Sequence, residues 1–336
     1  MSLQLDNLAR NMTDELDKAV AAKPVTGFFA DNPLRSKFVG AKTVLIPEME
    51  VSGLGDYDRD NGFVKGTIAV SAQPHVLAMD RGRSFQLDRE DNDETGIADL
   101  AGQVMGEFVR TQVVPEMDAY ILSKLAAHAV SKSQTVTGTP ASQAYKMMTD
   151  AVGKVQNAAG YDEELVAFVN SAMWTALQST AELSRQLVVS DFRKGELNTR
   201  VQSLNGVAVL PVPDNRMKSG FTFYDGTTSG QEEGGFVPAE GAKNIGLLVM
   251  PRRAASLVKK TEQVRVFDPA QNLGADAWKF DYRLYYDLFI RSSLSTAVYV
   301  YVYSRLIKLT KGGRGGEPRP LSRKGRLHLW QPDKRF

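Results

Sequence analysis

Three aspartates at alternate positions are the residues whose spacing most resembles a binding motif. Asp56, Asp58 and Asp60 repeat the opening of an EF-hand calcium loop, in which carboxylates at alternate positions bind the ion. In that loop a glycine stands at the sixth position and a bidentate carboxylate at the twelfth. Here the glycine is Gly62, one position late, and Thr67 stands in place of the carboxylate. The pattern therefore favours an acidic turn between two strands over a calcium site.

Other motifs that could support chemistry are incomplete. Gly53 and Gly55 are followed by neither a third glycine nor a helix, so they form no dinucleotide-binding fingerprint. Residues 226–230 have the wrong spacing for the nucleophile elbow of a hydrolase. The chain has no cysteine, which excludes disulfides and thiolate ligands, and its three histidines lie far apart. We therefore predict no catalytic residue, no metal, no cofactor and no enzymatic activity; a hydrolase with an unrecognised site is the alternative.

The composition indicates a folded protein without a membrane segment. The 336 residues are 43% hydrophobic, enough for the core of one large or two modest domains. No stretch reaches the roughly 18 apolar residues that a membrane span needs. Residues 1–20 carry acidic side chains and no apolar run, so we expect no signal peptide. We predict a protein made in a cytoplasm, without a membrane partner.

Charge is distributed unevenly along the chain. Residues 305–336 hold ten lysines and arginines against two acidic residues, although the net charge of the whole chain is only +2. The remainder is therefore acidic, which bears on solubility and partners rather than on fold. Glycines within residues 312–316, with Pro318 and Pro320, oppose regular structure, so we predict a disordered basic tail over residues 304–336. Loose binding of this tail to a polyanion is compatible with disorder.

A long helix is the most prominent predicted element. From residue 94 to residue 131 apolar residues recur at helical spacing, among them Ile97, Leu100, Val104, Phe108, Val114, Met117, Ile121 and Leu125. A helix of this length would run on the order of 50 Å. Pro115 removes one backbone donor and should bend the helix without ending it, because the periodicity resumes beyond it.

A β-hairpin is predicted before the long helix. Residues 43–51 form one arm and residues 63–70 the return, joined by a connection that is rich in turn residues and charge. A further strand at 84–88 leads into the helix. The hairpin has too few apolar residues for a core of its own, so it needs the surface of a partner.

The rest of the chain mixes helices and strands without a regular βαβ series. We predict helices at 141–159 and 172–179, strands at 165–169, 207–210 and 245–249, and an exposed loop at 219–243. Residues 278–303 alternate strongly, which predicts a sheet with one wet or partner-covered face. The fold class is α+β.

Several stretches, taken in order, resemble the major capsid proteins of tailed bacteriophages that have the HK97 fold. They are VSGLGDYDR at 51–59, DRGRSFQLDREDNDET at 80–95, VVPEMDAY at 113–120, VPDNRM at 212–217, VFDP at 266–269 and DYRLYYD at 281–287. Each is a weak match alone, and the similarity covers residues 38–303, about four-fifths of the chain. The chain departs from this family in continuing about 33 residues beyond Tyr303.

The resemblance implies a specific division of the chain. Residues 1–41 would be an N-terminal arm, 42–93 an extended loop with its base, 94–140 and 256–303 a peripheral domain, 141–255 an axial domain, and 304–336 the tail. The long helix would be the spine of the peripheral domain, and the hairpin would reach over a neighbouring subunit.

The resemblance also implies partners and a location. Copies would assemble as hexamers and pentamers into an icosahedral shell enclosing double-stranded DNA, in the virion, after assembly in the host cytoplasm. The short arm implies a separate scaffolding protein, and a portal is expected. An encapsulin-like compartment with protein cargo is the alternative.

Charged residues of the loop and its base are the candidate subunit-interface residues, because paired charges can fix register between subunits. They are Asp56, Asp58, Arg59, Asp60, Lys65, Arg81, Arg83, Asp88, Glu90 and Asp91. The alternative for each is that it keeps the surface soluble. Some relatives crosslink through a loop lysine, for which Lys65 is the candidate here.

Overall fold

The computed structural model describes residues 24–31, 37–40, 42–60, 62–89, 101–137, 143–179, 188–191, 200–204, 206–272 and 274–303. The predictions for most of the N-terminal arm, for the start of the long helix, for Glu90 and Asp91, and for the basic tail lie outside these residues. Within them, no helix is long and apolar enough to cross a membrane.

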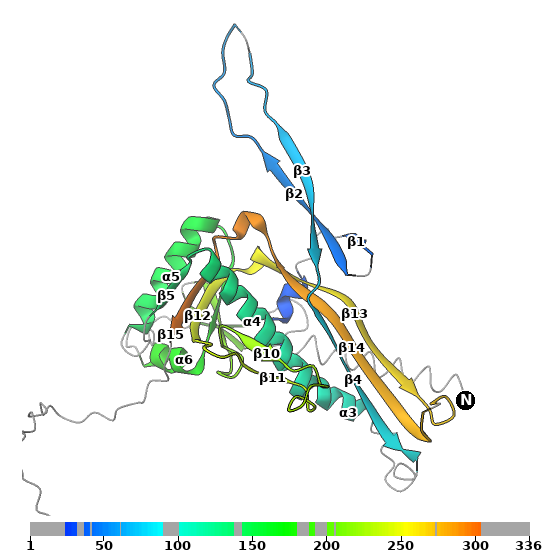
Figure 1. Ribbon diagram of the computed structural model, residues 1–336. Coiled ribbons are helices and arrows are strands. Elements are labelled where there is room, and N and C mark those ends of the chain that lie inside the picture. The colour runs from blue at the N-terminus through cyan, green and yellow to red at the C-terminus, as the bar shows by residue number, and fades with distance from the viewer. Residues whose placement is uncertain are drawn as a thin grey trace, which may run out of the picture. The chain divides into compact units, whose positions relative to one another are not determined.

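The predicted long helix is confirmed from Ala101 to Ser131 (Figure 1), and we call this segment the spine. It consists of α3 (Ala101–Phe108), a π-helical turn η3 (Val109–Val113) and α4 (Val114–Ser131). Pro115 lies in the first turn of α4 and has no amide hydrogen to donate to the helix. The π turn that precedes it already interrupts the regular α-helical hydrogen bonds, so little is lost there. As predicted, Pro115 does not end the helix.

A three-stranded antiparallel sheet lies beside the spine (Figure 1). Its strands, in spatial order, are β13 (Ala255–Phe267), β14 (Ala277–Ile290) and β4 (Met79–Asp88). Phe108 of the spine packs edge-to-face against Phe85 of β4 and Tyr282 of β14, with ring centroids 4.9 and 5.8 Å apart. These aromatic contacts join the sheet to the helix.

The largest sheet of the described chain is mixed and has seven strands. Its order is β5 (Thr135–Thr137), β15 (Tyr299–Tyr303), β12 (Asn244–Pro251), β6 (Leu165–Val169), β9 (Val207–Pro211), β8 (Arg200–Leu204) and β7 (Val188–Asp191). The helices α5 (Ala144–Ala159) and α6 (Ser171–Gln178) lie beside this sheet (Figure 1). The predicted helices and strands of this region are confirmed, with β6 matching its predicted residues. Short 3-10 helices cover Gly27–Asp31 (η1), Arg252–Ala254 (η5) and Ser292–Leu294 (η6).

The prediction of one wet or partner-covered face for residues 278–303 holds only for the first half of β14, where Arg283 is exposed between buried Tyr282 and Leu284, and it is wrong for β15. Strand β15 lies between β5 and β12, and four of its five residues are buried, as is most of β14. The tyrosines can be buried because Lys154 donates a hydrogen bond to the Tyr299 hydroxyl (2.8 Å) and Asn170 donates one to the Tyr303 hydroxyl. The range 256–303 is also divided between the two sheets, so β15 does not pair with β13 and β14. The division into peripheral and axial domains stays a prediction.

The hairpin is confirmed, but its return strand is shifted. Strand β2 (Thr43–Val51) pairs with β1 (Lys37–Val39) and with β3 (Ile68–Val76), whereas residues 63–70 were the predicted return. The amide of Thr67 donates to the Ser52 hydroxyl (2.8 Å) and the amide of Ser52 to the Thr67 carbonyl (3.0 Å). These bonds close the ladder, so most of the predicted strand lies in the terminal loop. The predicted loop at 219–243 contains a two-stranded hairpin, β10 (Phe221–Phe223) and β11 (Phe236–Pro238).

A buried carboxylate connects three distant segments of the body. Asp118 of the spine is fully buried and accepts hydrogen bonds from the Thr26 hydroxyl (2.6 Å), the Thr26 amide (3.1 Å) and the Arg216 guanidinium (2.9 Å). Burial raises the pKa of Asp118, and the Thr26 donors and the charge of Arg216 act in the opposite direction. This network fixes the segment after β9 and the residues before η1 to the spine.

We predict that Asp118→Asn lowers the free energy of unfolding of the unassembled chain by about 3 kcal/mol, because it removes the buried partner of Arg216 and leaves this partly buried guanidinium without a counter-charge. Urea denaturation followed by tryptophan fluorescence measures this. Asp162→Asn makes the same chemical change at an exposed position and should have little effect. Equal stability of the two variants would contradict a structural role for the Asp118 network.

Candidate subunit interface

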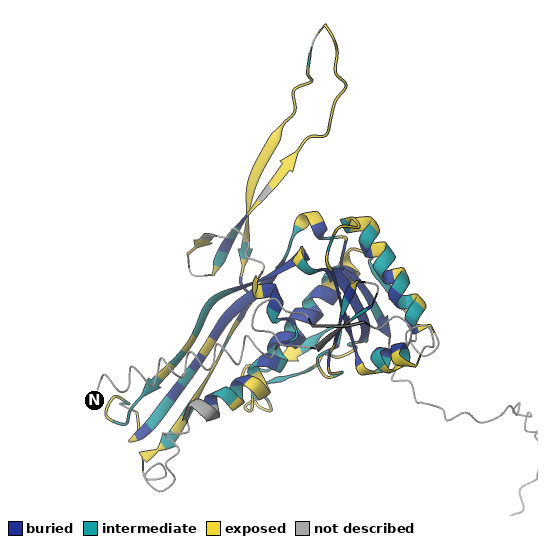
Figure 2. Ribbon diagram, turned by 180° about the vertical axis from the view of Figure 1, so that it is seen from behind, coloured by how far each residue is buried: buried dark blue, intermediate teal, exposed yellow. Residues whose placement is uncertain are grey.

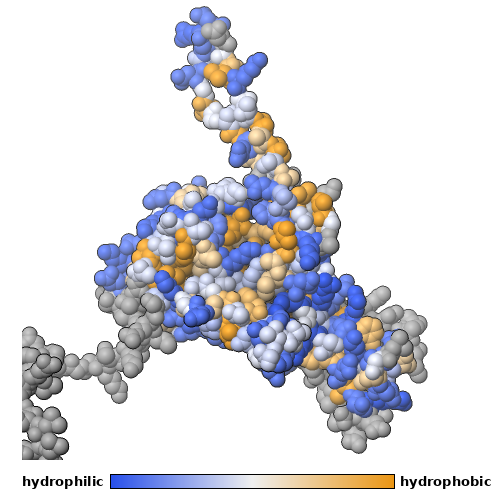
Figure 3. All heavy atoms as spheres, viewed as in Figure 1, coloured by the Kyte–Doolittle hydropathy of each residue, from blue (hydrophilic) through white to orange (hydrophobic). Residues whose placement is uncertain are grey.

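One face of the projecting hairpin is apolar and exposed. In the register of β2 and β3, Met49 lies opposite Val70 and Val51 lies opposite Ile68. Directly opposed residues share a face of a β-ribbon and alternate residues return to it, so these four side chains form one patch. Their exposed fractions lie between 66% and 70%. We call these four residues the apolar patch; Figure 3 shows hydrophobic side chains along the hairpin.

The other face of the hairpin is polar along its outer half and buried at its base. Glu50 lies opposite Ala69, and both are exposed. Closer to the body, Val44 and Ile46 are buried in a small core whose other members are Leu77, Val258, Tyr285 and Phe289. The hairpin is therefore anchored at its base and exposed over its outer length (Figure 2). All the exposed large hydrophobic residues of the described chain except Val130 and Tyr161 lie between Phe38 and Val76.

The joint between hairpin and body lies at Leu77 and Ala78. The amide of Leu77 still donates to the carbonyl of Lys42 (2.9 Å), beside the start of β2. The amide of Ala78 donates instead to the carboxylate of Asp287 on β14 (3.1 Å). At this point the chain leaves β2 and enters the three-stranded sheet as β4, so β3 and β4 are joined by two residues.

Asp287 connects this joint to the spine. Its side chain is 2% exposed. It accepts a hydrogen bond from the Tyr120 hydroxyl (2.8 Å) and forms an ion pair with Lys124. Burial, followed by the negative charge of Asp287, raises the pKa of Tyr120. The Tyr120 hydroxyl therefore keeps its proton and remains a donor, and the base of the hairpin is fixed to the helix.

The tip of the hairpin is the acidic turn that the sequence predicts. Asp58 and Gly62 form an isolated antiparallel bridge, and Gly62 has a φ of +78°, which a residue with a side chain rarely adopts. The amide of Asp60 donates to the Asp58 carboxylate (2.8 Å). In the described part of the chain, no group of three or more acidic or histidine residues could hold a metal ion. Tyr57 and Phe63 flank the bridge, with ring centroids 4.9 Å apart.

The predicted interface residues lie in two separate places. Asp56, Asp58, Arg59, Asp60 and Lys65 are exposed around the tip, whereas Arg81, Arg83 and Asp88 lie on β4. Glu90 and Asp91 lie outside the described residues. The assignment of these residues to contacts between subunits, and of Lys65 to a crosslink, stays a prediction.

Arg81 is bound within its own chain. Its guanidinium forms a two-point ion pair with Glu116 of the spine (2.6 and 3.1 Å) and donates to the carbonyl of Tyr224 (2.7 Å). Arg83, two residues along β4, donates to the carbonyl of Glu232 (3.0 Å). The two arginines thereby attach the loop between β10 and β11 to β4. We call residues 224–235 the β10–β11 loop.

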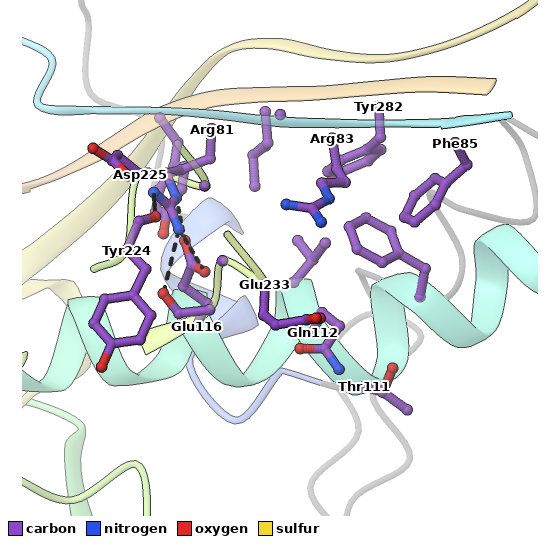
Figure 4. Close-up of a pocket in the computed structure, with 18 residues that line it drawn as sticks. Arg81, Arg83, Phe85, Thr111, Gln112, Glu116, Tyr224, Asp225, Glu233 and Tyr282 are labelled. Atoms are coloured by element: carbon purple, nitrogen blue, oxygen red, sulfur yellow. Dashed lines mark hydrogen bonds and ion pairs between the residues drawn. The ribbon is translucent and has the colours of Figure 1, made fainter. Parts of the chain in front are cut away.

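A pocket of about 610 Å³ lies beneath this loop, between β4 and the spine (Figure 4). Phe85, Phe108 and Tyr282 form an aromatic wall, and Arg83, Gln112 and Glu233 provide polar groups. The sequence analysis missed the pocket, because its residues come from four segments that are far apart in the chain and share no motif. The signals were Arg81 and Arg83, which line the pocket and were selected for their charge alone.

Known structures share this fold. The capsid of Ralstonia phage GP4 matches with a TM-score of 0.56 and 8% identity, over 82% of this chain and 87% of that chain. A chain from Gordonia phage Cozz matches with a TM-score of 0.54 and 13% identity, over 84% and 87% of the two chains. The mature capsid of bacteriophage PhiM1 matches with a TM-score of 0.50 and 12% identity, over 79% and 83%. The predicted fold, α+β of the HK97 type, is confirmed.

Sequence comparisons add nothing to this. No protein-family model matches the chain, and no curated protein matches it. At such low identity the structural likeness establishes the fold, and function has to be argued from the surface of this chain.

We predict that Arg81→Lys loosens the β10–β11 loop, because an ammonium cannot reproduce the two-point pair with Glu116 and the bond to the Tyr224 carbonyl together. Hydrogen exchange of the loop amides should quicken about tenfold. Arg265→Lys makes the same change at an exposed position of β13 and should leave the loop unaffected. Unchanged exchange in Arg81→Lys would show that the turns of the loop hold it without Arg81.

Proposed function

We propose, from the HK97 capsid fold as premise, that this chain is the major capsid protein of a tailed phage. Copies of it assemble as hexamers and pentamers into an icosahedral shell that encloses double-stranded DNA. A separate scaffolding protein and a portal take part, and assembly takes place in the host cytoplasm. The observation that carries the proposal is the apolar patch on a hairpin that contacts its own body only at the base.

The apolar patch supports a contact between proteins. Burying one aliphatic side chain fully contributes about 1.5–3 kcal/mol, so leaving four of them exposed forgoes a substantial stabilisation. Isolated exposed apolar residues are ordinary on a protein surface, but a contiguous set on one face of a ribbon is typical of an interaction site. A two-stranded ribbon gains independent stability only when a further layer covers it.

Another copy of the chain is the partner that fits best. The hairpin and the surface that it covers are different parts of the molecule, so the contact is heterologous, and heterologous contacts that close produce rings and shells. Each contact need only be modest, because every subunit both donates and receives a hairpin and the contacts reinforce one another. Solved phage capsids with the same fold are assemblies of this kind of subunit.

We predict that Val70→Lys abolishes shell formation, because it places a charge within the apolar patch. Ala69→Lys is the matched control: it adds the same charge to the adjacent residue, on the opposite face and opposite Glu50, where assembly should persist. Both sites are exposed, so the stability of the unassembled chain should change by no more than about 0.5 kcal/mol. Negative-stain electron microscopy counts the particles. Normal particles from Val70→Lys would contradict burial of the apolar patch in the shell.

The cargo distinguishes a phage capsid from an encapsulin-like compartment. We predict that particles recovered from phage-producing cells contain double-stranded DNA that is protected from nuclease, because the shell is closed around it. Gel electrophoresis after nuclease treatment and particle disruption measures this. Particles that hold an enzyme and no DNA would instead establish the compartment.

A further inference from the structure

We infer that Pro47 and Pro74 block the two open edges of the projecting hairpin and so keep unassembled chains from joining strand to strand. Each proline lies where a residue of another type would present a backbone amide to a further strand. The inference concerns the chain before assembly and does not depend on the proposed function.

The hydrogen bonds at the two ends of the hairpin fix which backbone groups of β2 and β3 face each other. The amide of Ser52 donates to the carbonyl of Thr67 (3.0 Å), and the amide of Leu77 donates to the carbonyl of Lys42 (2.9 Å). Between these pairs the register of β2 and β3 is continuous. Hydrogen-bonded and non-hydrogen-bonded pairs alternate in an antiparallel ladder, so the even residues of β2 bond to the odd residues of β3. The backbone groups of the odd residues of β2 and of the even residues of β3 therefore face outward.

Both prolines occupy outward-facing positions. Pro47 lies opposite Ala72 and Pro74 lies opposite Leu45, so each belongs to a pair that shares no hydrogen bond. Because these positions make no bond across the hairpin, the missing amide hydrogen of proline costs the ladder nothing. A proline one position earlier or later in either strand would instead remove a bond between β2 and β3. The missing donor is thus lost only to a strand that approaches from outside.

The outer edges of the hairpin are otherwise open. Among the described strands, β3 pairs only with β2, and β1 covers β2 no further than Leu45, opposite Lys37. Figure 2 shows the projecting parts of both strands as exposed. An open strand edge is a template to which a strand of another chain can add. The outward amides that remain are those of Met49 and Val51 on β2 and of Ile68, Val70, Ala72 and Val76 on β3.

The composition of β3 favours pairing between chains. Residues 67–73, TIAVSAQ, contain no charged residue and no proline, and include the β-branched Thr67, Ile68 and Val70. An uncharged segment of this kind on an exposed edge is typical of strands that stack into aggregates. Pro74 follows this segment directly and interrupts the row of donors before Val76. Pro47 is the first outward position of β2 beyond the cover of β1 and interrupts the row on that edge.

Proline protects these edges without adding charge to the apolar patch. Edge strands are commonly protected by charged side chains or by proline. In this hairpin the four residues of the apolar patch are among those whose backbone groups face outward, so their side chains and the open edges belong to the same residues. A lysine there would protect the edge but would also charge the patch. Proline removes a donor and leaves the face apolar.

Restoring the missing donors tests the inference. Pro47→Thr combined with Pro74→Thr adds one outward amide to each edge, and threonine is more polar than proline, so added apolar surface cannot cause association. We expect the unassembled double variant to form thioflavin-binding aggregates about tenfold faster than the unaltered chain. In these aggregates the amides of Ile68, Val70 and Ala72 should be protected from hydrogen exchange. Each single variant should show a smaller acceleration.

Two controls separate the restored donor from other effects. Pro213→Thr removes an exposed proline outside the strands. Ser71→Thr places threonine in β3 at an exposed residue whose amide already faces β2. Both should aggregate at the rate of the unaltered chain. The inference is overturned if the double variant and both single variants aggregate no faster than these controls, or if their aggregates leave the outward amides of β3 unprotected. Circular dichroism of the soluble fraction should show an unchanged fold, because both prolines are exposed.

Discussion

The structure depends on one constraint, which is that a two-stranded ribbon cannot cover its own faces. Of the two faces of the β2–β3 hairpin, one is buried only near the base, by Val44 and Ile46, and the other presents the apolar patch to solvent. Leaving that patch uncovered forgoes stabilisation of the isolated chain, and such a patch is typical of an interaction site. Successive side chains of a strand point to opposite faces, so the apolar patch and the polar face alternate along the same strands. For this reason two adjacent residues can differ sharply in whether they tolerate a charged substitution.

A projecting ribbon can only contribute to an assembly if its base is rigid. Here the base is held by a buried carboxylate, Asp287, which binds the backbone at the joint and two side chains of the spine. Asp118 performs a similar role two residues before Tyr120 in the spine, joining the spine to Thr26 and Arg216. Buried ions are costly to desolvate, so they contribute more to a single arrangement of segments than to net stability. The direction in which the hairpin leaves the body is thereby set by the spine.

Local periodicity predicted most of the elements, and non-local partners explain what it missed. The long helix, strand β6 and the hairpin each carry their pattern within their own residues. Strand β15 alternates tyrosine and valine like a half-exposed strand, but Lys154 and Asn170, which supply the partners of its hydroxyl groups, lie far away in sequence. Phe63 and Val64 suggest a strand because they are apolar, but both are exposed in the terminal loop of the hairpin. The pocket could not be predicted at all, because four segments build it.

The low identity to the phage capsid structures that share this fold has a physical meaning for surface contacts. At 8–13% identity the fold is preserved by patterns, a period of two in the strands and of 3.6 in the spine, and by a few buried contacts, not by particular surface residues. Contacts between subunits only need to match within one shell, so the two surfaces that meet in such a contact can change together while the fold stays the same.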